Sequence, residues 1–510
     1  MKLTKVTDST ISYNPQNLTI QSDTEGSFDA WHSIPSTYTK VAQYHANTGS
    51  STTDTTLGVK LETTYAAYIS SSQPADTYVG QVKYTMVHPY TEAPLQPQTT
   101  ASGKICYYAN ASSYDGTMGC QSISTSATTA KLFASNLSRT GYGFAGWSDV
   151  FDYATNSNAH FYGPNKDITF TTGQYTGSNP GLSLYAVWVK SAGNFQDSSK
   201  TTTVCNNLTA ASVNGTRTLA SVSALTDTRD NQTYAIAKLA DGNCWMIENL
   251  RLDNAATLTL TNTNNPLNDG TNVTLKHNYT DSQTYNTLSA TSNVAYDADT
   301  APDGWCETDS KACDDQSRLR TDNTANRITY TSGQTMSSAS ANLYSYGNYY
   351  NWYSATAGRG TISFSTNNNS AAGDLCPTNW RLPKSGNKAR IESNDDNEFW
   401  NLIVDSLNAG INPTNYASST KPYYKSSAEV EPVSALARTY PNNFVCSGYI
   451  HGSTLQRGSY SVYWSSTAES SAYAYGFTLS NDIVYPGTNT NFNGGKYTGR
   501  SIRCLVSPSE

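Results

Sequence analysis

The sequence predicts a mainly β protein of the α+β class, built from several domains in which strands predominate over helices. Three observations lead to this prediction. The chain has 510 residues, too many for one hydrophobic core, because domains usually hold about 100–150 residues. Short runs alternate apolar and polar residues, the period-two pattern of half-buried strands. Clusters of Gly, Pro, Asn and Asp separate these runs, as turns between strands require.

The composition is typical of an extracellular protein. Only 14% of the residues are charged, against about 25% in ordinary soluble domains. Ser, Thr, Asn and Tyr must therefore keep the surface soluble. The net charge is -7 and no run of Lys and Arg reaches five residues, so the chain has no basic patch that would suit a phosphate backbone. We expect no nucleic-acid partner.

Residues 1–90 are expected to form an antiparallel β-sandwich. Apolar and polar residues alternate in 59–62 and 82–86, and the turn residues of 73–76 separate the two runs. A connector with several prolines follows at 89–103. Because proline cannot pair within a central strand, the first module boundary is predicted there.

Residues 104–190 form the second predicted module, which contains the strings TGYGFAGW (140–147) and LSLYAVW (182–188). The glycines permit tight turns around Phe144 and Trp147, which we expect to pack in the core against the second string. The two strings resemble the internalin B-type repeat, also called the Listeria-Bacteroides repeat. That resemblance implies a β-grasp-like module of a bacterial surface protein.

The third predicted module spans 205–507 and carries five strings in one order. These are DGNCWMIENL (241–250), YGNYYNWY (346–353), LCPTNWRLP (375–383), YWSST (463–467) and SIRC (501–504). Together they resemble the Fibrobacter succinogenes major paralogous domain. The resemblance implies a secreted or cell-surface protein with a fold similar to C-type lectins and formylglycine-generating enzymes. It therefore implies a scaffold that displays a ligand-binding surface.

Within this module the tryptophans and one helix can be predicted from the residues alone. The tryptophans of the strings, Trp245, Trp352, Trp380 and Trp464, have apolar or Gly neighbours and are expected in the core. Apolar residues at four-residue spacing predict a helix over 397–407. The polar segment 254–301 is expected to be an insertion of loops and short strands.

The ligand-binding surface is predicted in residues 465–497. The order of modules looks like that of surface proteins of Saccharibacteria, in the candidate phyla radiation, and the lectin-like fold is also that of variable proteins of diversity-generating retroelements. In such proteins C-terminal strands and loops contact the ligand. Here Tyr, Asn, Ser, Thr and Asp lie between framework positions such as Phe477, Leu479 and Ile483, a mixture that recognition surfaces favour.

The candidate ligand-contacting residues fall into two groups. Those ranked first are Tyr473, Tyr475, Asp482 and Tyr485, followed by Asn481, Asn489, Asn491, Asn493 and Tyr497. The expected partner is a surface protein or glycan of a host or partner cell. Two alternatives stay open: the segment is an ordinary solvated loop, or the chain is a structural envelope protein that contacts copies of itself.

Nine cysteines without a CxxC pair favour disulfides over a zinc site. Connectivity does not follow from sequence, but the local pairs Cys106 with Cys120 and Cys306 with Cys313 are the simplest. Positions beside the family motifs add Cys205 with Cys244 and Cys376 with Cys504, and Cys446 is the candidate free thiol. Residues 1–14 do not resemble a signal peptide and no 18-residue apolar run occurs. We therefore expect a processed form of an exported protein, with a cytosolic, reduced protein as the alternative.

The sequence predicts no enzyme. Its six histidines are scattered over all three modules, at 32, 45, 88, 160, 277 and 451, and neither an HExxH nor a GxSxG motif occurs. Cys446 and Cys504 lack the motif that surrounds the copper site of formylglycine-generating enzymes. No cofactor is expected. Residues 394–398 (NDDNE) could offer oxygen ligands to Ca²⁺, but the same string is favoured as an ordinary helix start.

Overall fold

A computed structural model gives the fold of the chain, which separates into two compact units, residues 1–89 and 90–510. In the first unit the structure describes only strand backbones. In the second it describes 98, 101–171, 174–176, 179–211, 218–252, 257–261, 263–265, 273–276, 320–321, 336, 343–357, 370–386, 397–407, 434–449, 457–469, 473–480, 484–488, 495–496 and 498–507.

The first unit contains three antiparallel strand pairs among its described residues. β1 (Lys2–Lys5) pairs with β6 (Leu61–Thr64), β2 (Leu18–Ile20) with β5 (Ala42–Tyr44), and β3 (Ser22–Asp23) with β4 (Gly26–Ser27). The predicted strand at 59–62 overlaps β6, whereas 82–86 lies outside the described residues. The strand content agrees with a mainly β class, and the sandwich stays a prediction.

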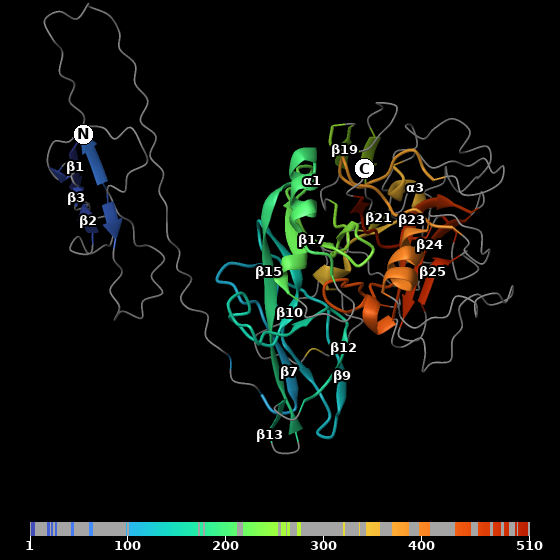
Figure 1. Ribbon diagram of the computed structural model, residues 1–510, viewed down its shortest axis with the longest axis horizontal. Helices are drawn as coiled ribbons and strands as arrows, with labels where there is room; N and C mark the ends of the chain where they lie inside the picture. Colours follow the sequence, from blue (N-terminus) through green and yellow to red (C-terminus); the bar gives the residue numbers. More distant parts are fainter. Residues whose placement is uncertain are drawn as a thin grey trace, which may run out of the picture. The chain divides into compact units, whose positions relative to one another are not determined.

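One nine-stranded sheet runs through the second unit (Figure 1). Its long strand β15 (Leu182–Asn194) pairs antiparallel with β10 (Tyr142–Ser148) and parallel with β7 (Lys104–Tyr108) and β16 (Val222–Thr226). The sheet continues through the remaining strands, which are β8 (Cys120–Ser122), β11 (Phe161–Tyr162), β17 (Thr233–Lys238), β18 (Cys244–Met246) and β26 (Leu505–Val506). Residues predicted to form the second and third modules therefore share one sheet.

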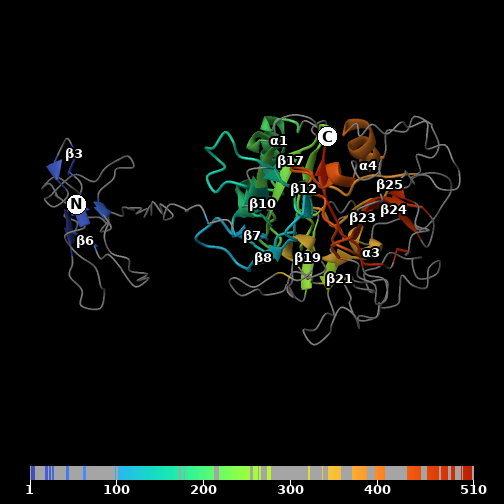
Figure 2. The ribbon, with the colours of Figure 1, turned by 90° about the horizontal axis from the view of Figure 1, so that it is seen from below.

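A three-stranded antiparallel sheet of β23 (Tyr460–Ala468), β24 (Ala474–Ser480) and β25 (Val484–Thr488) lies in another part of the same unit (Figures 1 and 2). Four two-stranded ladders complete the described strands: β9 (Thr129–Lys131) with β12 (Asp167–Thr169), β13 (Tyr175–Thr176) with β14 (Asn179–Pro180), β19 (Thr257–Leu260) with β20 (Val273–Lys276), and β21 (Arg320–Thr321) with β22 (Tyr349–Tyr350). The helical segments are α1 (Ser198–Asn207), α3 (Trp352–Ala355), α4 (Glu398–Trp400), the π-helix η9 (Asn401–Ser406), the 3-10 turns η3 (Leu219–Ser221) and η8 (Tyr344–Tyr346), and a helical turn at 434–437.

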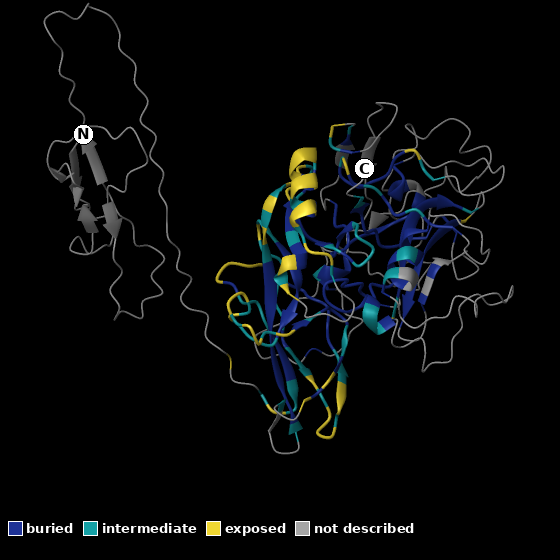
Figure 3. Cartoon of the chain, in the orientation of Figure 1, coloured by how far each residue is buried: buried dark blue, intermediate teal, exposed yellow. Residues whose placement is uncertain are grey.

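The core confirms the positions expected from the sequence. The four tryptophans of the strings, Trp245, Trp352, Trp380 and Trp464, are at most 1% exposed, and Phe144 meets Trp147 edge-on with ring centroids 4.9 Å apart. Figure 3 shows β23, β24 and the first half of β15 buried, whereas the second half of β15 is partly exposed and α1 exposes most of its length. Large aromatic side chains dominate the energetics of such cores.

The predicted helix over 397–407 is confirmed as α4 followed by η9. Asn397 caps it, because its side chain accepts a hydrogen bond from the backbone N–H of Trp400. Phe399, Ile403 and Leu407 are buried together. The favoured interpretation of 394–398 as a helix start thus agrees with the capping geometry, although 394–396 lie outside the described residues.

Among the described residues three disulfides form, Cys106–Cys120, Cys205–Cys244 and Cys376–Cys504, and Cys446 is free and buried. These confirm three of the expected pairs and the expected free thiol; Cys306 and Cys313 lie outside the described residues. Three bridges indicate an oxidising, extracellular environment. Among the described residues, no helix combines the length and apolar character needed to cross a membrane.

A partly buried carboxyl, that of Asp241, makes the stability of this unit pH-dependent. Burial raises the pKa of Asp241 to about 6, although Trp245 Nε1 donates a 2.9 Å hydrogen bond to its Oδ2. Because the unfolded pKa is about 3.9, the folded state holds the extra proton between these values. The contribution of Asp241 to the free energy of unfolding therefore falls by about 3 kcal/mol as the pH rises from about 4 to 6.

Asp241→Asn is accordingly expected to become more favourable relative to the natural chain as pH rises. The difference in free energy of unfolding should shift by about 3 kcal/mol in favour of the variant between pH 4 and 7. Urea unfolding at several pH values measures it. Asp152→Asn, at an exposed carboxyl, is the control and should show no such shift. A pH-independent difference at Asp241 would contradict the expectation.

Candidate binding surface

The predicted ligand-contacting segment lies largely in the three-stranded sheet. β23 and β24 form a hairpin whose register runs from Tyr460 opposite Ser480 to Ala468 opposite Ala474, and β25 pairs with the other edge of β24. At the loop end of the hairpin, Glu469 N–H donates a 3.0 Å hydrogen bond to the carbonyl of Tyr473. Ser465 Oγ donates a 2.8 Å bond to the carbonyl of Tyr475. These bonds hold the backbone beside both tyrosines.

The exposure of alternate residues increases along β24, from its buried end to the residue just before the strand. Leu479 and Phe477 are completely buried, Tyr475 is 9% exposed and Tyr473, just before the strand, is 40% exposed. Alternation along a strand places these four residues on one face of the sheet. That face is core at one end and surface at the other. The framework roles predicted for Phe477 and Leu479 agree with their burial.

The two tyrosines differ in burial. Burial, and secondarily the charge of Glu469, raises the pKa of Tyr475 to about 12. Its phenol therefore stays protonated, and a potential donor, throughout the physiological pH range. Tyr473 and Tyr114 are the large apolar side chains that the described chain exposes most. An aromatic ring held at the end of a buried column is a suitable anchor for a partner.

The structure brings two of the nine candidate residues together, Tyr473 and Tyr475. Tyr485 lies in β25 with its backbone in register with Thr478, and its side chain is outside the described part. The other six are also outside it: Asn481, Asp482, Asn489, Asn491, Asn493 and Tyr497, as is the framework position Ile483.

Buried cations near the end of the chain are a feature that the sequence analysis missed. Lys496 is fully buried with its ammonium 4.3 Å from the ring centroid of Trp352, and the Arg500 guanidinium lies 4.0 Å from the ring of Trp464. Arg503 packs over Phe444 and donates to Asn249 Oδ1 at 2.9 Å. Cation–π contacts of this kind are strongest where water is excluded. The one signal in the sequence for these cation–π contacts is that basic residues occur in a tyrosine-rich segment.

No family model, curated protein or solved structure matches this chain. The resemblances to the internalin B-type repeat and to the Fibrobacter domain therefore stay predictions. Within the ranges described above, no group of three or more His, Cys, Asp or Glu side chains is placed to hold a metal ion.

Proposed function

We propose that this chain is a secreted or cell-surface binding protein, without catalytic activity, that contacts a protein or glycan of a host or partner cell through residues 465–497. The observation that carries the proposal is the exposure of Tyr473 at the end of the buried column of β24. An exposed aromatic side chain on a hydrogen-bonded hairpin provides contact area at little cost in conformational entropy.

The rigidity of the support favours recognition over a simple solvated loop. Every residue of β24 is buried, and β23 is buried from Ser461 to Ala468. Binding groups on strands are held more accurately than groups on loops. The three disulfides support an extracellular location for the surface.

Diversification by a retroelement belongs to the same proposal. The buried framework positions alternate with polar residues between and after the strands, so that contact residues can change while the core stays constant. Such separation is what a variable protein needs, because core substitutions are destabilising and surface ones are usually tolerated.

Sequencing the locus in many related isolates tests this proposal. We expect substitutions to cluster in codons 463–497, to avoid the codons of Trp464, Phe477 and Leu479, and to occur beside a reverse transcriptase gene. Substitutions spread evenly over the third module, with no reverse transcriptase nearby, would reject diversification. A fixed adhesin or an envelope protein would then remain.

A further inference from the structure

A polar pocket that shares no residue with 465–497 opens where the start of β10, the turn between β16 and β17, and η8 meet. Its volume is about 120 Å³. Buried residues, including Phe144, Glu248 and Arg251, line it, and so do the exposed residues Asp115, Thr140 and Asn231. A cavity of this size holds several waters or one small ligand.

Arg251 lines the pocket, and one N–H of its guanidinium has no acceptor among the described residues. Its side chain is 3% exposed, its Nη1 donates to Glu248 Oε1 at 2.9 Å, and its Nη2 donates to the carbonyl of Thr233 at 3.0 Å. The rings of Tyr234 and Tyr344 lie 4.4 and 4.6 Å from its central carbon. Its Nε is buried and has no hydrogen-bond partner within the described structure. A buried donor of this kind requires an acceptor, and Arg251 is a residue of the pocket lining.

The charges of the pocket favour a neutral occupant. Glu248 is already committed to Arg251, and its other oxygen accepts from the backbone N–H of Phe144 at 3.0 Å and of Ala235 at 2.6 Å. Asp115 and Arg139 are the other ionisable acid and base of the lining, so two carboxylates face two guanidiniums. A ligand with a net charge would add a charge that no group of the lining compensates.

The aromatic and planar groups of the lining give the pocket amphipathic walls. The Arg139 guanidinium stacks 3.8 Å from the ring centroid of Tyr142, and Trp188 and Tyr344 add two more rings. Tyr344 Oη donates to Gln232 Oε1 at 2.7 Å. Such walls suit a ligand with an apolar CH face and polar edges.

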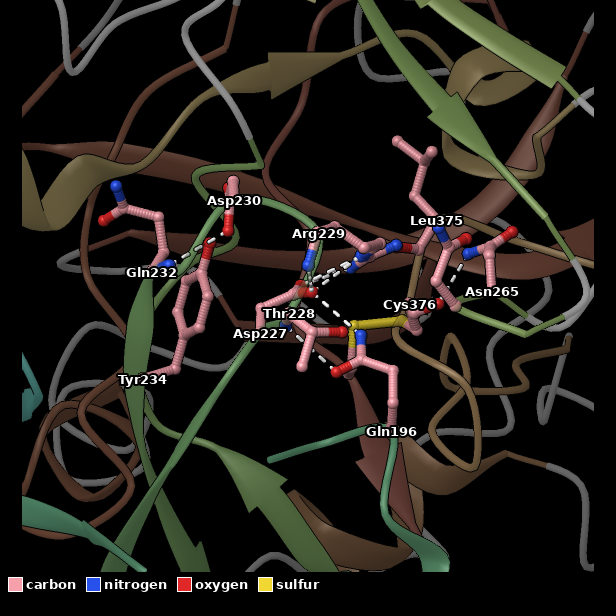
Figure 4. Close-up of polar contacts among 12 residues, drawn as sticks. Gln196, Asp227, Thr228, Arg229, Asp230, Gln232, Tyr234, Asn265, Leu375 and Cys376 are labelled. Atoms are coloured by element: carbon pink, nitrogen blue, oxygen red, sulfur yellow. Dashed lines mark hydrogen bonds and ion pairs between the residues drawn. A yellow bond between two sulfur atoms is a disulfide. The ribbon is translucent and has the colours of Figure 1, made fainter. Parts of the chain in front are cut away.

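The turn that carries Asn231 and Gln232 is held rigidly (Figure 4). Arg229 forms a buried ion pair with Asp227, 2.6 Å between Nη2 and Oδ2, and donates through Nη1 to the carbonyl of Leu375 at 2.7 Å. Asp230 Oδ1 accepts from the backbone N–H of Gln232 at 3.0 Å. This wall of the pocket is therefore preorganised, which lowers the entropic cost of binding.

We propose that the pocket binds one neutral sugar unit, whose CH face packs on the aromatic walls and one of whose oxygens accepts the Nε–H of Arg251. This proposal does not rest on the function assigned to residues 465–497. For a ligand of this size at ordinary ligand efficiency, the dissociation constant should be about 1 mM.

Saturation-transfer NMR on the full chain tests it, with the methyl glycosides of glucose, galactose, mannose, N-acetylglucosamine and N-acetylgalactosamine as probes. At least one should receive saturation. Thr140→Trp places a large side chain at the exposed rim and should abolish transfer, whereas Thr129→Trp, on exposed β9 and outside the lining, should not. Arg251→Lys keeps the charge but removes the Nε–H, together with the Nη donors to Glu248 and Thr233, and should weaken binding about tenfold.

Each result decides the proposal. No transfer to any of the five glycosides would mean that water fills the pocket, and the proposal fails. Equal transfer in Thr140→Trp and Thr129→Trp would place the sugar elsewhere and also overturn it. If Arg251→Lys does not fold, which thermal unfolding will show, the comparison of the two tryptophan variants alone decides.

Discussion

Replacing Cys376 and Cys504 together by alanine should lower the free energy of unfolding of the second unit by about 4–5 kcal/mol. The disulfide closes a sequence separation of 128 residues, whereas Cys106–Cys120 closes one of 14. In the chain-entropy model a longer loop means a larger loss of disorder in the unfolded chain. The corresponding Cys106 and Cys120 double variant should therefore lose about 3 kcal/mol.

Backbone hydrogen bonds also join the two chain segments that the Cys376–Cys504 disulfide links. Backbone hydrogen bonds of 2.9 and 3.0 Å join Leu505, the residue after Cys504, to Arg381, which follows Cys376 in the chain. Urea unfolding followed by tryptophan fluorescence measures both double variants, with the Cys106 and Cys120 pair as the matched control. Equal losses for the two bridges would contradict the loop-length argument.

Gly143→Ala should destabilise the second unit by about 3–5 kcal/mol. A Cβ at this position would lie 2.2 Å from the backbone nitrogen of Ala235 in β17, closer than any real contact. Backbone atoms cannot swing aside as a flexible side chain can, so β10 and β17 would have to separate. The hydrogen bonds from Phe144 and Ala235 to the single oxygen Glu248 Oε2 would then be lost.

Gly141→Ala is the matched control for this substitution. Gly141 has φ +76° and no atom within 4 Å of an added Cβ, so alanine there meets only backbone strain, about 1 kcal/mol. Thermal or urea unfolding of the two variants separates the effects. Similar losses at both positions would show that β10 and β17 are not tightly packed at Gly143.

The sequence predicted local features well because their determinants are local. The Cys106–Cys120 bridge spans few residues, and the helix at 397–407 carries its own cap and its own apolar spacing. The buried tryptophans followed from their apolar neighbours.

Apart from the Cys205–Cys244 and Cys376–Cys504 bridges, which were expected from their positions beside the family motifs, features that join distant segments could not be predicted. Nothing in the string around Gly143 indicates that it packs on Ala235, and nothing around Glu248 indicates that it accepts from Phe144, 104 residues earlier. The joint sheet and the pocket both depend on such contacts. Likewise, Tyr473 and Tyr475 look equivalent in the sequence, and only the distance of each from the core makes one exposed and the other nearly buried.

The claim that this face of β24 binds a partner is tested most directly by retention of the labelled full chain on host and neighbouring bacterial cells from the habitat of the source organism. Flow cytometry should detect retention, and Tyr473→Lys should reduce it by about tenfold or more, as loss of a central aromatic contact does. Thr129→Lys, at an exposed position of β9, should leave retention unchanged. Retention that Tyr473→Lys does not alter, or no retention on any of these cells, would contradict the claim.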